Sequence, residues 1–121
     1  MITKEVEHRL ADAIELAKSH RHEFTTLEHL LLSLLGSRVV IETLENCNVD
    51  VGLLRKDLRA HLKHLQIRIT DEQLESYGGF DSWQPEFSMA CHRLLQRATM
   101  QMRSSGRSQV TEQTLLISMF Y

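Results

Sequence analysis

The sequence predicts an all-α protein that forms a single domain from two related helical repeats. Its 121 residues include only five glycines and one proline, and the apolar residues recur at helical rather than alternating spacing. This length allows one hydrophobic core but is short for two. Apolar residues make up 42% and charged residues 25% of the chain, which is typical of globular proteins and argues against disorder.

The first two predicted helices follow directly from the apolar pattern. Residues 3–20 carry one apolar stripe and are expected to form an amphipathic helix. A second helix, short and rich in leucine, should begin at Thr25 or Thr26 and close at Gly36. A Thr25 cap would let Glu28 complete a capping box, whereas a Thr26 cap would not, and the sequence leaves both open.

Two more helices and a long connection complete the middle of the chain. A third helix is expected at about 38–47, and Asp50 can cap a fourth that ends near residue 65. Residues 66–86 lose the periodicity and contain Gly78-Gly79, so they are predicted to form a connecting loop. Loops of this length are normally flexible or functional. Its aromatic residues either pack on the core or offer an exposed apolar contact; they are Tyr77, Phe80 and Trp83.

The last two predicted helices repeat the first two. Ser88 can cap a fifth helix and Thr111 a sixth. Shifting the sequence so that Leu10 falls on Leu95 aligns these two helices with the first two predicted helices. We call this shift the repeat offset. It places Leu10, Ala13, Thr26, Leu30, Leu31 and Ser33 on Leu95, Ala98, Thr111, Leu115, Leu116 and Ser118. The domain therefore divides into a first repeat at about 2–65, the loop, and a partial second repeat at about 87–121.

The repeat also predicts the core and a truncation. Leu30, Leu31, Leu95 and Leu116 are expected to be nearly fully buried where the two halves meet. Counterparts of the third and fourth helices would begin near residue 123 by the repeat offset. The second repeat is therefore expected to be truncated at its carboxyl end.

Four segments resemble the amino-terminal domains of Clp-type AAA+ unfoldases of the ClpA kind. Residues 20–32 contain the Thr-x-Glu-His-Leu-Leu block that opens the second helix of the first repeat in that family. Residues 93–98 and 104–111 resemble the second repeat of the ClpA branch, and residues 46–50 also fit it. The resemblance implies the pseudo-twofold helical bundle of the double Clp N-domain motif.

The resemblance also implies a recruiting function. Such a domain docks the ClpS adaptor and delivers unfolded or tagged protein substrates to the remainder of an unfoldase hexamer and its peptidase. Positions matching the adaptor-docking face are Glu23, Glu28, Ser88, Arg93 and His22. Capping and solubility explain the two glutamates equally well, and Arg93 can equally be a solvated helix residue. The alternative is a disaggregase-type or stand-alone module that binds exposed hydrophobic polypeptide without an adaptor.

No catalytic motif is recognised. The chain lacks GxxxxGK[ST], so we expect a non-enzymatic module with no cofactor of its own, and ATP and Mg only in a parent protein. The seven histidines show no recognisable ligand spacing. They are interpreted as exposed or half-buried helix residues, with His22 and Glu23 as weak metal candidates. Cys47 and Cys91 lie in apolar runs and are expected to be reduced core residues.

Charge and hydropathy argue against two classes of partner. With 14 basic against 16 acidic residues, the formal charge of −2 gives no general attraction to nucleic acid. The longest apolar stretch, residues 30–35, is far too short to span a bilayer. The amino terminus has no secretory-signal pattern, so a cytoplasmic location is expected.

Overall fold

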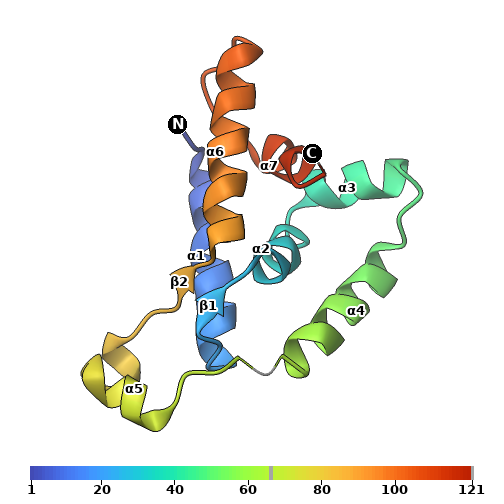
Figure 1. The fold of residues 1–121 in the computed structure, drawn as a ribbon. Coiled ribbons are helices and arrows are strands. Elements are labelled where there is room, and N and C mark those ends of the chain that lie inside the picture. Colours follow the sequence, from blue (N-terminus) through green and yellow to red (C-terminus); the bar gives the residue numbers. More distant parts are fainter. Residues whose placement is uncertain (66, 121) are drawn as a thin grey trace.

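The computed structural model describes residues 1–65 and 67–120 as a bundle of helices (Figure 1). Gln66, where the predicted loop begins, and Tyr121, where the predicted second repeat ends, lie outside the described residues. None of the described helices is long and apolar enough to cross a membrane. The helices are α1 (Lys4–Ser19), α2 (Leu27–Leu34), α3 (Arg38–Asn46), α4 (Val51–Lys63), α5 (Asp71–Ser76), α6 (Met89–Ser104) and α7 (Glu112–Ser118).

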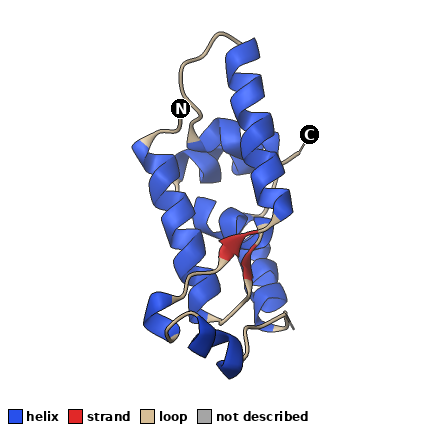
Figure 2. Ribbon diagram, turned by 60° about the vertical axis from the view of Figure 1, so that its left-hand side comes forward, coloured by secondary structure: helices blue, strands red, loops and turns tan. Residues whose placement is uncertain are grey.

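Two very short strands and a turn of 3-10 helix accompany the helices. Strand β1 (Phe24–Thr25) pairs in parallel with β2 (Glu86–Phe87), and the 3-10 turn spans Phe80–Ser82. Figure 2 shows the strand pair as a small link between helical segments. The prediction of an all-α bundle is confirmed, because the strands hold only two residues each.

The helices begin at residues that satisfy their first free amide groups. Asp50 and Ser88 accept the amides of Leu53 and Cys91 at 3.0 and 3.3 Å, as expected for N-caps. For α2 the cap is Thr26 rather than Thr25. A capping box nevertheless forms, because the side chain of His29 takes the place expected for a glutamate or glutamine.

The repeat offset also relates the backbone of the first hairpin, α1 and α2, to that of the last, α6 and α7. Helix α1, Lys4–Ser19, falls on α6, Met89–Ser104, and α2 and α7 begin at equivalent positions. The pairing of Thr25 with Phe87 has its counterpart in the parallel bridge between Val110 and Ile2.

The agreement extends to local backbone conformation. The turns after the first helix of each repeat both use a positive φ, 56° at Arg21 and 73° at Gly106. Only short polar residues and glycine adopt this conformation readily. A duplicated hairpin that keeps the turn even with an arginine in it supports the predicted internal repeat.

The core lies between the two hairpins. Helix α1 packs on α2 and α6 packs on α7, and α2 meets α7. Helix α3 of the first repeat packs on α7 of the second, whereas α4 packs on α2. The described residues after α7 contain no counterparts of α3 and α4.

Two predictions about the core need correction. Leu30 and Leu116 are 0% and 1% exposed, but Leu31 and Leu95 are only half-buried. The apolar face of each helix is wider than the part that neighbouring helices cover, so residues at its edge stay partly exposed. Cys91 is buried as expected. Cys47 is exposed, because it follows the last turn of α3 as its C-cap.

The predicted loop over residues 66–86 contains structure. Helix α5 begins with a capping box between Thr70 and Gln73, and a separate small cluster forms from Ile69, Leu74 and Trp83. Of the three aromatic residues, Trp83 is therefore buried, whereas Tyr77 and Phe80 remain exposed. The interpretation of this segment as a connecting loop without structure of its own is wrong.

Candidate docking surface

The strand pair brings the beginnings of α2 and α6 together, although three whole helices separate them in the sequence. The buried Thr25 carbonyl accepts the amide of Ser88 at 3.0 Å and the thiol of Cys91 at 3.3 Å. The Thr25 hydroxyl donates to the carbonyl of Pro85 at 3.3 Å. These contacts fix the first turn of α2 beside the first turn of α6.

Two carboxylates lie at this junction. Glu23 precedes β1 and Glu28 lies in the first turn of α2; both are half-buried, and neither forms an ion pair with another described residue. Burial raises the pKa of the Cys91 thiol, and the charge of Glu28 adds to this effect. Glu28 is therefore close enough to α6 to influence a buried group on that helix.

Exposed apolar side chains occur at the same junction. Phe24, between Glu23 and the buried Thr25, is 40% exposed, and Met89, the first residue of α6, is 67% exposed. Neither belongs to a helical stripe, so the periodicity did not mark them. We define the docking surface as Glu23, Phe24, Glu28, Ser88 and Met89.

Arg93 lies at the border of this surface rather than against the carboxylates. It is exposed and stands one helical turn after Met89 on α6. It is also two residues beyond the buried Cys91, which places it about 200° around the helix from that residue. The structure gives Arg93 no contact with Glu23 or Glu28, so a common face for the four residues remains a prediction.

His22 does not belong to the exposed surface, contrary to the prediction from the resemblance. Its side chain is 0% exposed, and its Nδ1 lies 2.8 Å from Nε2 of His29, which is also 0% exposed. The Nδ1 of His29 accepts the amide of Thr26 at 2.9 Å. A docking partner therefore has no access to His22, and the interpretation of these two histidines as exposed or half-buried is wrong.

The hydrogen bonds determine where the protons lie on the two rings. His29 accepts at Nδ1, so its neutral ring carries the hydrogen on Nε2 and donates it to Nδ1 of His22. His22 must then carry its hydrogen on Nε2, which is a buried atom. Adding a proton to His29 would place an N–H against the Thr26 amide.

Electrostatics agree with a neutral pair. Burial lowers the pKa of His29 to about 4, with His22 contributing further, and burial also lowers the pKa of His22. The ring of His20 stacks on His22 at 5.1 Å between centroids, and both His20 and Arg68 lower the pKa of His22 further. The described part of the chain holds no group of three His, Cys, Asp or Glu arranged for a metal ion, and a metal role of His22 and Glu23 stays a prediction.

Comparisons with known proteins agree with the fold and with the repeat. The chain is 31% identical over 115 residues to a ClpA homolog protein from Fuscovulum blasticum, covering 95% of this chain but only 14% of that protein. Its structure is similar to the Hsp104 N-terminal domain from Candida albicans, with a TM-score of 0.78 and 15% identity, over 97% of this chain and 71% of the other. Residues 1–121 match the Clp repeat (R) N-terminal domain family. Together with the duplicated hairpins, these matches show that the chain belongs to the Clp repeat N-terminal domain family.

Proposed function

We propose that this chain is a recruiting module of a Clp-type unfoldase and that it docks the ClpS adaptor at the docking surface. It delivers adaptor-bound substrates to an ATP-driven hexamer and its peptidase in the cytoplasm, with ATP and Mg bound elsewhere in the parent protein. The module itself is not an enzyme in this proposal. The family, the resemblance of residues 20–32 and the absence of a phosphate-binding motif support it.

One observation carries the adaptor proposal. The strand pair joins the first turns of α2 and α6, and this junction carries two carboxylates without ion-pair partners among the described residues and the exposed Phe24 and Met89. Apolar side chains surrounded by charged ones are typical of a protein interface, in which the apolar centre supplies affinity. Charges of this kind mainly set association rate and specificity. The matching partner surface would present a lysine or arginine to Glu28 and an apolar pocket to Phe24.

We predict that Glu28→Lys weakens adaptor binding by about tenfold or more, because it reverses the charge that the partner meets. His29, not Glu28, completes the capping box of α2, so the cap survives the substitution. The expected loss of stability is only the favourable interaction of a carboxylate with the helix dipole, ~0.3 to 1 kcal/mol. Isothermal calorimetry with purified adaptor and thermal unfolding measure the two effects.

A matched control separates a local effect from a change in overall charge. Glu45→Lys makes the same charge change on the exposed side of α3 and should leave adaptor affinity unchanged. Equal weakening by both variants, or none by Glu28→Lys, would contradict the docking assignment.

The alternative function is adaptor-independent binding of exposed hydrophobic polypeptide. The exposed Tyr77 and Phe80 favour it, at 56% and 44% exposure, because exposed apolar surface can mark an interaction site. The same calorimetry with a permanently unfolded, carboxymethylated protein tests this alternative. Binding of that protein without binding of the adaptor would support it over the adaptor proposal.

A further inference from the structure

A cleft in the first repeat lies between α1, the end of α2 and α4. It has a volume of about 300 Å³, which is at the small end of the range for ligand sites and suits a molecule of the size of an amino acid or a dipeptide. Every residue that lines it belongs to the first repeat. Charged and apolar side chains share its lining, among them Asp12, Leu16, Leu32, Leu35, Arg55 and Arg59. We call this the first-repeat cleft.

Two positive charges stand on the α4 wall of the cleft. Arg55 and Arg59 are four residues apart in one helix, so they lie on the same face and repel each other. Neither forms an ion pair with another described residue. Arg55 donates to the carbonyl of Leu35 at 3.1 Å and keeps further N–H groups for a ligand. An anion bound in the cleft would therefore relieve a repulsion that the free protein retains.

A negative charge stands on the α1 wall. The side chain of Asp12 is 50% exposed, and its ion-pair partners, His8 and Arg9, are both 3.8 Å away. That distance is too long for a hydrogen bond, so the carboxylate can still accept from a ligand. Arg9 makes its short contacts elsewhere, because it donates to the carboxylate of Glu112 at 2.9 Å and to the carbonyl of Ser33 at 3.2 Å.

The leucines supply an apolar surface in the same cleft. Leu35 is buried, and Leu16 and Leu32 are half-buried, so a ligand that covers the latter two gains from removing their remaining surface from water. The cleft thus combines a pair of cations, a carboxylate and an apolar surface. An apolar amino acid or a short apolar peptide carries the three complementary groups, which are a carboxylate, an ammonium group and an apolar side chain.

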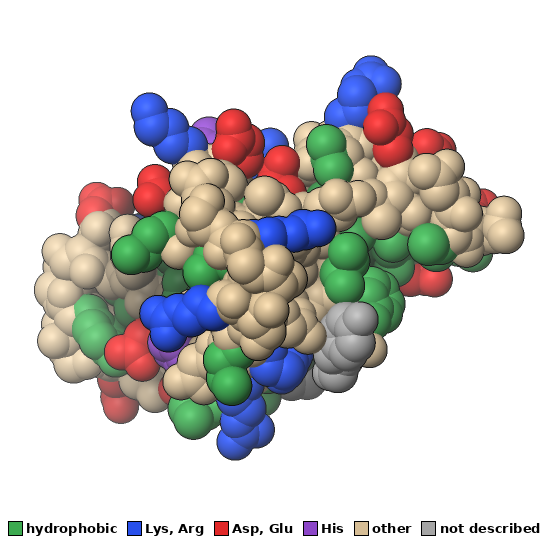
Figure 3. All heavy atoms as spheres, turned by 90° about the horizontal axis from the view of Figure 1, so that it is seen from above, with side chains coloured by type: hydrophobic (Ala, Val, Ile, Leu, Met, Phe, Trp, Pro, Cys, Tyr) green, Lys and Arg blue, Asp and Glu red, His purple; other side chains and the backbone are tan. Residues whose placement is uncertain are grey.

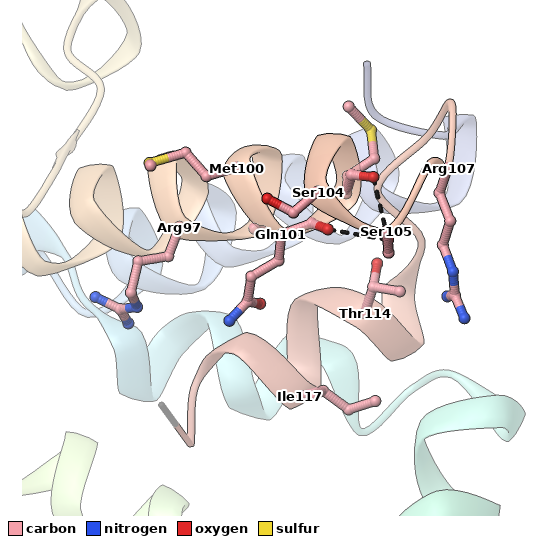
Figure 4. Close-up of a pocket in the computed structure, with 10 residues that line it drawn as sticks. Arg97, Met100, Gln101, Ser104, Ser105, Arg107, Thr114 and Ile117 are labelled. Carbon is pink, nitrogen blue, oxygen red and sulfur yellow. Dashed lines mark hydrogen bonds between the residues drawn. The ribbon is translucent and has the colours of Figure 1, made fainter.

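The second repeat does not reproduce this combination at the equivalent positions. The repeat offset places Arg97 on Asp12 and Gln101 on Leu16. Figure 4 shows the side chains of Arg97 and Gln101 extending from α6 toward α7. A cation therefore stands where the first repeat has its carboxylate, and an amide where it has a leucine. The site belongs to the first repeat alone.

The separation of charge in the cleft is a local feature. At the end of the molecule that Figure 3 views from above, red acidic and blue basic side chains are intermingled, and the formal net charge of the chain is only −2. A zwitterion has no net charge, so the overall field of the protein does not attract it. Its recognition requires opposite charges held close together, as they are in the first-repeat cleft.

We propose that the first-repeat cleft binds an apolar amino acid or a short apolar peptide as a zwitterion. The carboxylate of the ligand pairs with Arg55 and Arg59, its ammonium group pairs with Asp12, and its side chain covers Leu16 and Leu32. No residue of the docking surface lines the cleft, so the proposal does not depend on the adaptor.

Matched small ligands test each of these contacts. Leucine and leucyl-leucine are titrated separately into the 121-residue chain, and binding is followed by calorimetry and by the amide chemical shifts of α1 and α4. N-acetyl-leucine lacks the ammonium group and leucinamide lacks the carboxylate, so each should bind about tenfold more weakly than leucine, the usual loss for one charge-assisted hydrogen bond. Glycine, which lacks the apolar side chain, should also bind more weakly.

The two zwitterions distinguish the sources of this chemistry. Tighter binding of leucyl-leucine identifies a peptide as the ligand, and tighter binding of leucine identifies a free amino acid; either result supports the proposal. Equal binding of leucine and N-acetyl-leucine would overturn it, as would the absence of binding by both zwitterions in the millimolar range.

Substitutions in the chain locate the ligand. Arg59→Gln and Asp12→Asn each remove one charge from the cleft and should weaken binding of the tighter zwitterion by about tenfold. Asp12→Asn should also abolish the preference for leucine over N-acetyl-leucine, which a mere loss of stability would not do. Lys56→Gln and Glu5→Gln make the same charge changes outside the cleft and should leave the affinity unchanged. Affinity that both cleft variants keep, or that the outside variants lose equally, would contradict the assignment.

Discussion

His22, which follows α1, and His29 of α2 form a hydrogen bond that requires both rings to be neutral. The Thr26 amide fixes the hydrogen of His29 on Nε2, and the 2.8 Å contact passes this constraint to His22. The pair thus connects the residues after α1 to the cap of α2. Both rings must remain neutral for the hydrogen bonds from the Thr26 amide to His29 and from His29 to His22 to form together.

Acid should therefore destabilise the protein through this pair. The unfolded state takes up a proton on His29 near its ordinary pKa of 6.5, but the folded state does so only near 4. Stability from His29 is complete above about pH 6.5 and falls as the pH decreases toward 4, by about 1.4 kcal/mol per pH unit. Urea unfolding at about pH 7.5 and about pH 5 should differ by ~2 kcal/mol through this group.

His29→Gln isolates that contribution. Glutamine is a usual third residue of a capping box and does not titrate, so the variant should lose less stability between the two pH values than the wild type. The comparison rests on the pH dependence rather than on absolute stability, so a packing cost of the substitution does not obscure it. Equal pH dependence in both proteins would show that His29 does not titrate differently on folding.

At the scale of elements, the sequence predicted long helices well and short elements poorly. Apolar periodicity and caps such as Ser88 and Thr111 located the starts of α6 and α7 correctly. Helix α5 was missed although Thr70 and Gln73 form a capping box, because six residues are too few to show a period. The two-residue strands carry no alternating pattern either, so the pairing of β1 with β2 could not be read from the sequence.

Adjacent leucines of α2 should differ in their effect on stability. Leu30 is 0% exposed, so Leu30→Ala should lower the free energy of unfolding by ~2 to 5 kcal/mol through lost burial and the cavity it leaves. Leu31 is half-buried, and Leu31→Ala should cost about half as much. Both substitutions change helix propensity equally because they lie side by side in one helix. Urea unfolding of the two variants that gave the same loss would contradict the burial difference.

At the scale of the whole molecule, the duplication determines how the two helical hairpins are arranged. The repeat offset, visible in the sequence, also relates caps, turns and the strand contacts in the structure. The crossing of α3 onto α7 was not predictable, because a repeat pattern gives equivalence but not which faces of the two halves meet. Of the residues that the resemblance assigned to the candidate site, Glu23, Glu28 and Ser88 lie at one junction, whereas His22 is buried, and the docking role of the three stays a prediction.

Glu112 ties the two repeats together and should be important for their joint unfolding. It opens α7 of the second repeat, its side chain is only 12% exposed, and it binds two residues of the first repeat. One carboxylate oxygen accepts Nε of Arg9 at 2.9 Å, and the other accepts the hydroxyl of Ser37, the cap of α3, at 2.9 Å. The other ion pairs among the described residues each include a side chain at least 50% exposed, and such pairs contribute little.

We therefore predict that Glu112→Ala lowers the free energy of unfolding by ~2 to 3 kcal/mol, because it leaves the partly buried Arg9 without its carboxylate. Glu112→Gln, which retains the shape and one acceptor, should cost about half of that. Glu45→Ala on the exposed side of α3 is the matched control and should change stability by less than about 0.5 kcal/mol. Urea unfolding followed by far-ultraviolet circular dichroism measures all three, and one transition should remain in each variant because α3 and α7 still share the core. A loss at Glu112 no larger than that at Glu45 would show that packing of α3 on α7, rather than this carboxylate, joins the two repeats.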